Sequence, residues 1–210
     1  MRTGFIGLGA MGAPMARNLH KAGLLTGVWN RSAPAAVALA AELGVAQPSS
    51  PAELAAGCEA IVICVSADQD VLDVVRAIAP RLAPGTLVID CSTISANAAR
   101  EAAAIVATRQ AAFLDCPVSG GVEGARQGTL AVMCGGAAEA FARAQPVLQA
   151  MGKTITHFGA TGAGQAAKAT NQIMCAGIIR AVAEAMAFAH SQGLPLPALA
   201  RFGLTLSVAG

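Results

Sequence analysis

Residues 3–19 read Thr3-Gly-Phe-Ile-Gly7-Leu-Gly9-Ala-Met-Gly12-Ala-Pro-Met-Ala-Arg-Asn-Leu19, and they are the most informative part of the chain. Its first residues favour a short buried strand, its spaced glycines a tight turn, and the residues after them a helix. Gly7 permits the sharp bend, Gly9 lets a pyrophosphate approach the backbone, and Gly12 lets helix and strand pack closely. Because a helix N-terminus also favours anions, the turn predicts a dinucleotide site made of Gly7, Leu8, Gly9, Ala10, Met11 and Gly12. An ordinary glycine turn is the alternative, but the flanking strand and helix are the context that the motif requires.

The composition indicates a soluble protein of one large domain, or of one domain and part of another. Hydrophobic residues, many of them alanine, make up 55% of the 210 residues, yet no uninterrupted apolar run approaches the ~18 residues of a membrane span. A net charge of +2 without a Lys/Arg cluster argues against a nucleic-acid partner, and no membrane partner is expected. The six cysteines are scattered without a C-x-x-C pair, which predicts buried thiols in a cytoplasmic protein and neither disulfides nor a metal site.

Strand-like and helix-like segments alternate along the first three quarters of the chain. Strands are expected at 3–7, 27–30, 60–65, 87–90, 112–115, 130–134 and 154–158, and helices at 11–22, 33–43, 51–56, 69–79, 96–107 and 138–151. The core strands are continuous apolar runs, such as Ile61-Val-Ile-Cys-Val65, which is typical of parallel strands covered by helices on both faces. The pattern predicts the α/β class, with a Rossmann-type, doubly wound and mostly parallel sheet in residues 1–162.

The pattern changes from residue 163 onward. Residues 165–192 contain no proline and are compatible with one helix of about 28 residues and roughly 42 Å, far longer than the usual ~11–12 residues. A helix of this length usually connects two domains or forms an oligomer interface. We therefore expect 163–210 to hold a long interdomain helix and the start of a second domain, and the protein to be a homodimer or homotetramer through that helix.

The residues after three strands are candidates for cofactor binding, since ligands of open α/β sheets bind at the carboxyl ends of the strands. Asn30, Arg31 and Ser32 stand where an NAD-selective site has an acidic residue, and a guanidinium and a hydroxyl suit a 2′-phosphate, so NADP is preferred to NAD. Val65, Ser66 and Thr93 would flank the ribose or nicotinamide. Helix N-capping is an equally good reading for Ser66 and Thr93.

Two later motifs are candidates for substrate chemistry. Ser119-Gly120-Gly121 supplies a hydroxyl and successive unhindered N–H groups, which suit a small carboxylate substrate, although a plain turn would explain it nearly as well. Lys168, Asn171 and Gln172 share one face of the long helix, at spacings of three and four residues. A lysine on a helix is usually solvated, but one beside two amides near a helix N-terminus also suits proton transfer.

Taken together, these motifs resemble the β-hydroxyacid dehydrogenase family, which includes 3-hydroxyisobutyrate dehydrogenases and tartronate semialdehyde reductases within the 6-phosphogluconate dehydrogenase superfamily. Residues 5–19 resemble its N-terminal signature. Asp115-Cys-Pro-Val-Ser-Gly-Gly121 resembles its substrate loop, and Gly164-x-x-x-Lys168-x-x-Asn171 its catalytic motif. The resemblance implies an NAD(P)-dependent oxidoreductase that interconverts a small 3-hydroxy acid and its semialdehyde.

The resemblance also implies roles for individual residues. Lys168 would be the general acid/base, Asn171 would orient the substrate, and Ser119, Gly120 and Gly121 would hold its carboxylate. Family members continue into an all-helical C-terminal domain, whereas this chain ends at Gly210, so we expect it to be a C-terminally truncated member. An NADP-binding protein without turnover and a relative of the imine reductases are the alternatives, and the presence of Lys168 argues against both.

Overall fold

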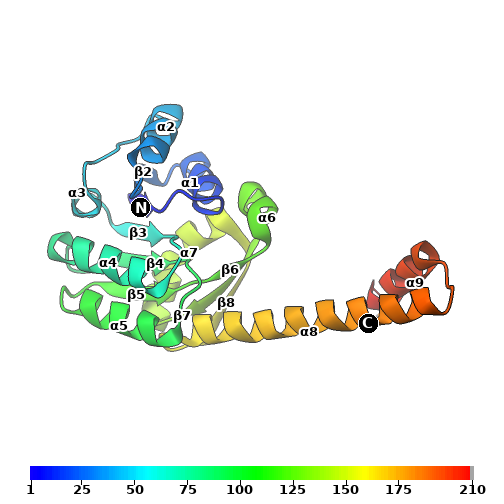
Figure 1. Ribbon diagram of the computed structural model, residues 1–210. Coiled ribbons are helices and arrows are strands. Elements are labelled where there is room, and N and C mark those ends of the chain that lie inside the picture. The colour runs from blue at the N-terminus through cyan, green and yellow to red at the C-terminus, as the bar shows by residue number, and fades with distance from the viewer. Residues whose placement is uncertain (209–210) are drawn as a thin grey trace. The chain divides into compact units, whose positions relative to one another are not determined.

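A computed structural model describes the backbone of residues 1–208 and the side chains of residues 1–202 (Figure 1). It divides into two compact units, Met1–Lys168 and the chain from Ala169 onward, so the boundary lies inside one long helix. The strands are β1 (Thr3–Ile6), β2 (Leu25–Trp29), β3 (Ala60–Ile63), β4 (Leu87–Asp90), β5 (Ala112–Asp115), β6 (Val118–Ser119), β7 (Leu130–Gly135) and β8 (Gly152–Gly159). The helices are α1 (Gly12–Lys21), α2 (Ala33–Leu43), α3 (Pro51–Ala56), α4 (Asp68–Ile78), the 3-10 turn η1 (Ala79–Arg81), α5 (Ala96–Ala107), α6 (Gly121–Gln127), α7 (Ala138–Met151), α8 (Ala163–Ser191) and α9 (Leu196–Val208).

The first unit is built on one sheet of order β2-β1-β3-β4-β5-β7-β6, with β8 paired to β7. The neighbours in the series β2-β1-β3-β4-β5 pair in parallel, and β7 also pairs in parallel with β8. The contacts of β7 with β5 and β6 are antiparallel. The strand order reverses beside β1, where β2 and β3 flank the first strand. This reversal is the switch point at which open α/β sheets bind their ligands.

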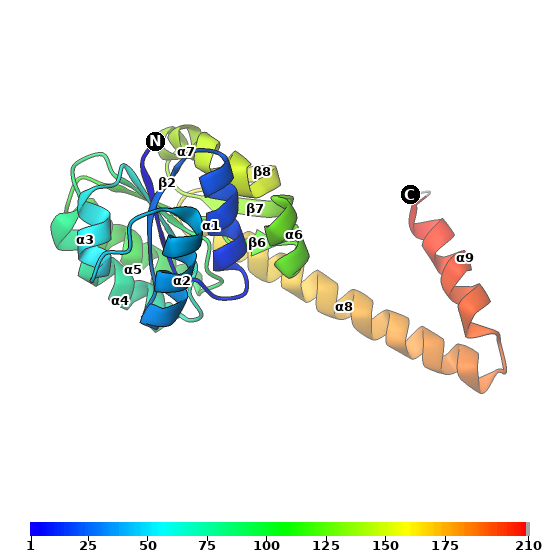
Figure 2. The same cartoon turned by 90° about the horizontal axis from the view of Figure 1, so that it is seen from above.

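Two hydrophobic clusters cover the two faces of this sheet. Alternate strand residues such as Phe5, Val62 and Ile89 face α1, α2 and α7. Their neighbours, such as Ile63 and Val88, face α3, α4 and α5. Figure 2 shows the helices gathered around the sheet when the molecule is viewed from above. Burial on both faces explains why the core strands are apolar throughout, and it confirms the predicted doubly wound α/β class.

Four elements were not expected from the sequence: η1, β6, α6 and α9. The α6 sequence GVEGARQ contains two glycines, which have low intrinsic helix propensity. Tertiary contacts compensate for this, because the buried Asn18 side chain on α1 donates a hydrogen bond of 2.7 Å to the Ala125 carbonyl oxygen. Because this partner lies 107 positions away, no local pattern could reveal it.

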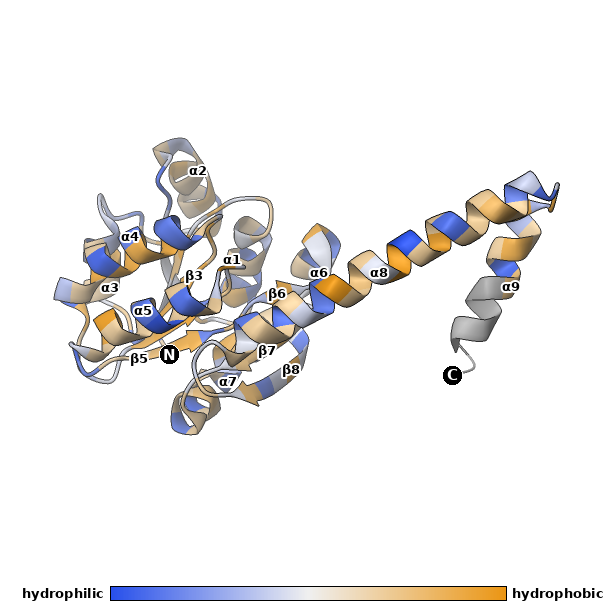
Figure 3. Ribbon diagram, turned by 60° about the horizontal axis from the view of Figure 1, so that its bottom comes forward, coloured by the Kyte–Doolittle hydropathy of each residue, from blue (hydrophilic) through white to orange (hydrophobic). Residues whose placement is uncertain are grey.

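The second unit consists of the remainder of α8 and the helix α9. Gly193 has φ +69°, and the Leu194 N–H bonds the Ala189 carbonyl oxygen, so α8 ends in a left-handed turn of the kind that glycine favours. Large apolar side chains on this part of α8 are exposed: Ile173, Met174, Ile178, Ile179, Val182 and Phe188. Figure 3 shows these hydrophobic turns interrupted by hydrophilic ones. The expected oligomer contact along the helix stays a prediction.

Candidate active site

The three glycines of the first turn differ in their surroundings. Gly7 has φ +95°, and a Cβ there would overlap the Cys64 carbonyl oxygen. A Cβ on Gly12 would overlap the Gly7 carbonyl oxygen, so both positions require glycine for the packing of β1, β3 and α1. A Cβ on Gly9 would meet nothing within 4 Å. The turn therefore leaves open space above Gly9 at the N-terminus of α1, and a pyrophosphate fits this cradle.

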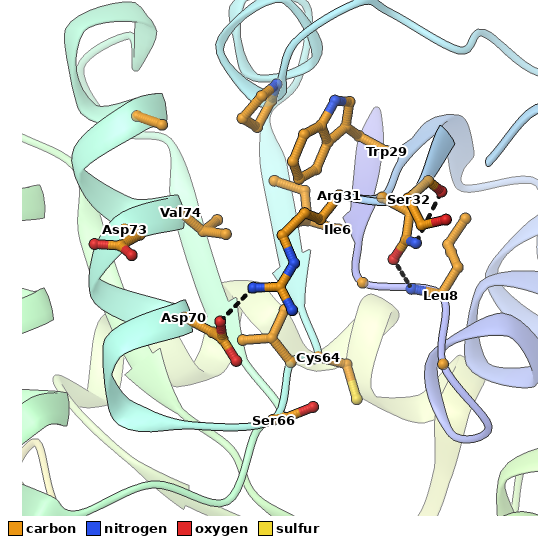
Figure 4. Close-up of a pocket in the computed structure, with 16 residues that line it drawn as sticks. Ile6, Leu8, Trp29, Arg31, Ser32, Cys64, Ser66, Asp70, Asp73 and Val74 are labelled. Atoms are coloured by element: carbon orange, nitrogen blue, oxygen red, sulfur yellow. Dashed lines mark hydrogen bonds and ion pairs between the residues drawn. The ribbon is translucent and has the colours of Figure 1, made fainter. Parts of the chain in front are cut away.

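A cavity of about 400 Å³ lies beside this turn, at the switch point of the sheet. The turn after β1 and the ends of β2 and β3 form one side of it, and α4 forms the other (Figure 4). Eight of the residues predicted to bind the cofactor line it: Gly7, Leu8, Gly9, Asn30, Arg31, Ser32, Val65 and Ser66. The structure thus brings most of the predicted cofactor residues together in one cavity.

The three residues after β2 take different parts in this cavity. Asn30 accepts a hydrogen bond of 2.9 Å from the Leu8 N–H through Oδ1, and donates one of 3.0 Å to the Ser32 carbonyl oxygen. It therefore ties the glycine turn to the end of β2. Ser32 is the N-cap residue of α2 but makes no side-chain capping bond, which leaves its hydroxyl available to a ligand. Arg31 reaches across to α4, where its Nη1 lies 2.7 Å from Asp70 Oδ1.

Neither Ser66 nor Thr93 caps a helix. The N-cap of α4 is Ala67, and that of α5 is Ser95, whose hydroxyl accepts a hydrogen bond of 3.1 Å from the Ala98 N–H. The capping interpretation is therefore wrong for both residues. Ser66 is exposed in the cavity, whereas Thr93 is exposed outside the cavity lining. Of the remaining predicted residues of the turn, Met11 and Gly12 stand at the start of α1, and Ala10 lines a neighbouring cavity.

Sequence reasoning missed the apolar and acidic parts of the cavity. Trp29, the only tryptophan of the chain, lines it together with Pro51 and Val74. Asp70 and Asp73 line it from α4. The end of the second strand lacks the acidic residue of an NAD-selective site, but α4 brings two carboxylates to the same cavity. The apolar periodicity of α4 alone does not show which side chains face a ligand.

The N-terminus of α8 is fixed to the carboxyl edge of the sheet by buried hydrogen bonds. Asp115, at the end of β5, accepts bonds from the Gly162 N–H (2.8 Å) and the Gln165 N–H (2.9 Å). The Gln165 side chain accepts a bond of 3.1 Å from the Ile94 N–H and donates one of 2.8 Å to the Ser92 carbonyl oxygen. Burial raises the pKa of Asp115, and these backbone donors oppose that shift. The sequence did not indicate a role for Gln165.

Asp90 lies beside Asp115 in the sheet register and is fully buried. Its Oδ1 accepts a hydrogen bond of 3.0 Å from the Ser92 N–H, while its Oδ2 is the one buried side-chain oxygen or nitrogen in the described part of the chain without a partner. Burial raises the pKa of Asp90 to about 7, and the neighbouring Asp115 adds to the rise. Ser92 in turn accepts a bond of 2.9 Å from the Val65 N–H through its hydroxyl. Ser92 after β4 thus connects Val65, which lines the cavity after β3, with Gln165 of α8.

The predicted substrate loop forms the junction of β6 and α6. Ser119 ends β6, and Gly120 and Gly121 have φ of +132° and +62°, values that glycine adopts readily. A Cβ on Gly121 would meet nothing within 4 Å, so the start of α6 is open. The loop follows the end of β5 directly in the chain, and Asp115 at that end also holds the start of α8 by hydrogen bonds.

Lys168 stands one helical turn after Gln165, at the end of the first unit. The residue is 8% exposed, which is unusual for lysine. Among the residues that the structure describes, its ammonium group has no hydrogen-bond or ion-pair partner. Asn171 and Gln172 follow on the next turn of α8, in the second unit.

The fold and the cavity define a dinucleotide-binding protein of the Rossmann type. Residues 2–159 match the family model described as the NAD binding domain of 6-phosphogluconate dehydrogenase. Residues 162–202 match the model described as NAD-binding of NADP-dependent 3-hydroxyisobutyrate dehydrogenase. The chain belongs to the β-hydroxyacid dehydrogenase family, as its motifs predicted.

Named relatives and solved structures agree with this assignment. An NAD-dependent L-serine dehydrogenase of Pseudomonas aeruginosa is 44% identical over 200 residues, covering 93% of this chain and 66% of the relative. A 3-hydroxyisobutyrate dehydrogenase of the same organism is 42% identical, covering 90% of this chain and 64% of the relative. A structure of Mycobacterium tuberculosis 3-hydroxyisobutyrate dehydrogenase with L-serine matches with a TM-score of 0.89 and 41% identity, covering 93% of this chain and 67% of that one. The chain thus spans about two thirds of the length of these relatives.

The long helix α8 also meets a membrane-span criterion. Among the described residues, Ala163–Ser191 is the one helix long and apolar enough to cross a membrane, with a mean hydropathy of 1.4. One such helix is weak evidence, because the same composition occurs in soluble proteins. The helix also carries an Arg180–Glu184 ion pair of 2.9 Å, and it lies within the second matched nucleotide-binding family model.

Proposed function

We propose that this chain carries the cofactor site and the proton-transferring lysine of an NADP(H)-preferring dehydrogenase that interconverts a small 3-hydroxy acid and its semialdehyde. The observation that carries the proposal is the placement of Lys168. It is a buried lysine without a carboxylate partner in the described chain, one turn after a helix N-terminus fixed to the sheet edge. A lysine used only for solubility would be exposed.

The proposed substrate class is defined by two groups that such a site can recognise, a primary hydroxyl and a carboxylate. L-Serine and 3-hydroxyisobutyrate both carry a primary hydroxyl two carbons from a carboxylate, and these are the compounds named for the relatives. The N–H groups of Gly120 and Gly121 and the Ser119 hydroxyl suit the carboxylate, and the space beside Gly121 is open. Asn171 and Gln172 supply amides that would orient the hydroxyl and the carbon chain.

In the proposed reaction Lys168 handles the proton. During oxidation the neutral Nζ accepts the substrate hydroxyl proton as the carbonyl forms, and in reduction it returns that proton to the carbonyl oxygen. The nicotinamide cofactor, when bound, accepts or supplies the hydride. Its pyrophosphate would lie at the turn of Gly7 to Gly12, and the 2′-phosphate of NADP(H) would meet Arg31 and the Ser32 hydroxyl.

Replacing Lys168 tests this proposal. The 210-residue chain is assayed for oxidation of L-serine and 3-hydroxyisobutyrate with NADP⁺, beside Lys168→Ala and the matched control Lys153→Ala, which removes an exposed lysine of β8. We expect Lys168→Ala to lower kcat by about 10²–10⁴-fold with little change in the Kd for NADPH. We expect Lys153→Ala to behave like the wild type.

Two results would contradict the proposal. One is nucleotide binding by the wild-type chain without turnover of either substrate, which would make the chain a binding protein. The other is a Lys168→Ala variant that turns over substrate at the wild-type rate, which would assign the proton transfer to another group.

A further inference from the structure

We propose that Asp70 is a specificity-determining residue that competes with the 2′-phosphate of NADP(H) for the Arg31 guanidinium and thereby limits the preference for NADP(H) over NAD(H). This inference rests on the proposed function, because it concerns the nucleotide that the proposed enzyme uses. From the sequence, only residues at the end of β2 are expected to select between NADP(H) and NAD(H), and the inference adds a carboxylate from α4 to them.

The contact between the two side chains carries the inference. Arg31 Nη1 lies 2.7 Å from Asp70 Oδ1, and both residues line the cavity at the switch point. Figure 4 shows the Arg31 side chain extending from the end of β2 to the first turn of α4, with Asp70 at its tip. The Asp70 side chain is 27% exposed and the Arg31 side chain 85% exposed. Asp70 is thus mostly buried against its surroundings, while the Arg31 side chain is accessible to a ligand.

The charges predict how each nucleotide responds to this pair. A 2′-phosphate carries close to two negative charges and needs the guanidinium that Asp70 holds. Either Arg31 leaves Asp70, or the phosphate binds beside a carboxylate of like charge, and both disfavour the phosphate. The 2′-hydroxyl of NAD(H) is neutral and meets neither cost. Asp70 therefore penalises NADP(H) selectively.

Asp73 provides a matched control on the same helix. It also lines the cavity, and its carboxylate carries the same charge as that of Asp70. Its partners are Gln69, at 2.6 Å, and Arg76, at 3.6 Å, so it does not hold Arg31. Asp73→Asn removes one negative charge from the cavity and leaves the Arg31–Asp70 pair in place.

The test is a measurement of binding by the 210-residue chain. Kd values for NADPH and NADH are measured by isothermal titration calorimetry for the wild type, Asp70→Asn, Asp73→Asn, Arg31→Ala and the Arg31→Ala/Asp70→Asn double variant. At low salt we expect Asp70→Asn to tighten NADPH binding by about fivefold, the upper range for an exposed ion pair, and to leave NADH binding nearly unchanged. We expect a smaller gain from Asp73→Asn, and a similarly small gain from Asp70→Asn when Arg31 is absent, because only the general charge effect then remains. The gain should shrink at about 1 M salt, where the Debye length falls to ~3 Å.

The outcomes separate this inference from the proposed function. If both nucleotides bind and Asp70→Asn changes their Kd values by the same factor, or weakens NADPH binding, the inference is wrong and the proposed function stands. An equal gain from Asp73→Asn would also overturn it, because general charge would then explain the effect. If the wild-type chain binds neither nucleotide, the proposed function fails and the inference fails with it.

Discussion

At the scale of single residues, the glycine turn contains two positions that the packing requires to be glycine and one that it does not. Gly7 and Gly12 have backbone oxygens where a Cβ would stand, so they are required by the close approach of β1, β3 and α1. Gly9 has open space in the same direction, so the folded chain itself does not require glycine there. In the proposed function, the pyrophosphate of the nucleotide would use this space.

Asp90 gives a prediction at this scale. Its pKa is about 7 in the folded chain and near 3.8 when unfolded, so the native state holds its proton over this interval. The resulting stabilisation is fully present below pH 3.8 and is lost as the pH rises towards 7, by at most about 4 kcal/mol from the linkage relation. Asp90→Asn keeps an oxygen for the Ser92 N–H but does not titrate. We therefore expect the free energy of unfolding of the wild type, relative to Asp90→Asn, to fall between pH 4.5 and pH 7 in denaturant titrations, by an amount consistent with this limit.

The control for this prediction is Asp73→Asn, which removes a carboxylate whose side chain is 63% exposed. Its free energy of unfolding relative to the wild type should not show the same slope. A difference between the wild type and Asp90→Asn that stays constant with pH would mean that Asp90 does not retain its proton in the folded chain.

At the scale of elements, the helices α2, α3, α5 and α7 were predicted with their observed bounds, because each has a clear local start or end. Pro at the first turns and Gly44 after α2 are examples. Of the elements that were missed, η1 and β6 are short, and α6 depends on the distant residue Asn18. The same limit applies to the site: glycine spacing indicated the nucleotide turn, whereas Gln165 and Asp70 act through partners far along the chain.

The N-terminus of α8 yields a prediction at the scale of elements. Gln165→Ala would leave the Ile94 N–H and the Ser92 carbonyl oxygen without their side-chain partner in a buried place. We expect the free energy of unfolding to fall by about 2–4 kcal/mol, since each unsatisfied buried group costs about 1–3 kcal/mol. The measurement is urea unfolding of the variant beside Gln149→Ala, an exposed glutamine of α7. If the two variants lost equal stability, the buried bonds of Gln165 would not be what fixes α8.

At the scale of the whole molecule, the chain combines a complete nucleotide-binding fold with a helical second unit that exposes apolar side chains. The predicted class and family depend on local patterns, and they are confirmed, while the nucleotide turn stays a prediction. The first unit contains the glycine turn, the cavity, Ser119–Gly121 and Lys168, while Asn171 and Gln172 belong to the second. We therefore expect nucleotide binding to be a property that the first unit has by itself.

We infer that this chain binds a nicotinamide dinucleotide at the open side of Gly9. Trp29 is the only tryptophan and lines the cavity, so its fluorescence reports binding directly. NADPH is titrated into the wild type, Gly9→Ala and the control Gly57→Ala, which adds a Cβ in open space away from the cavity lining. We expect saturable quenching for the wild type and Gly57→Ala, and a Kd raised by about tenfold or more for Gly9→Ala with an unchanged Tm. The absence of saturable quenching in the wild type, or equal Kd values for Gly9→Ala and the wild type, would show that the nucleotide does not bind at this position.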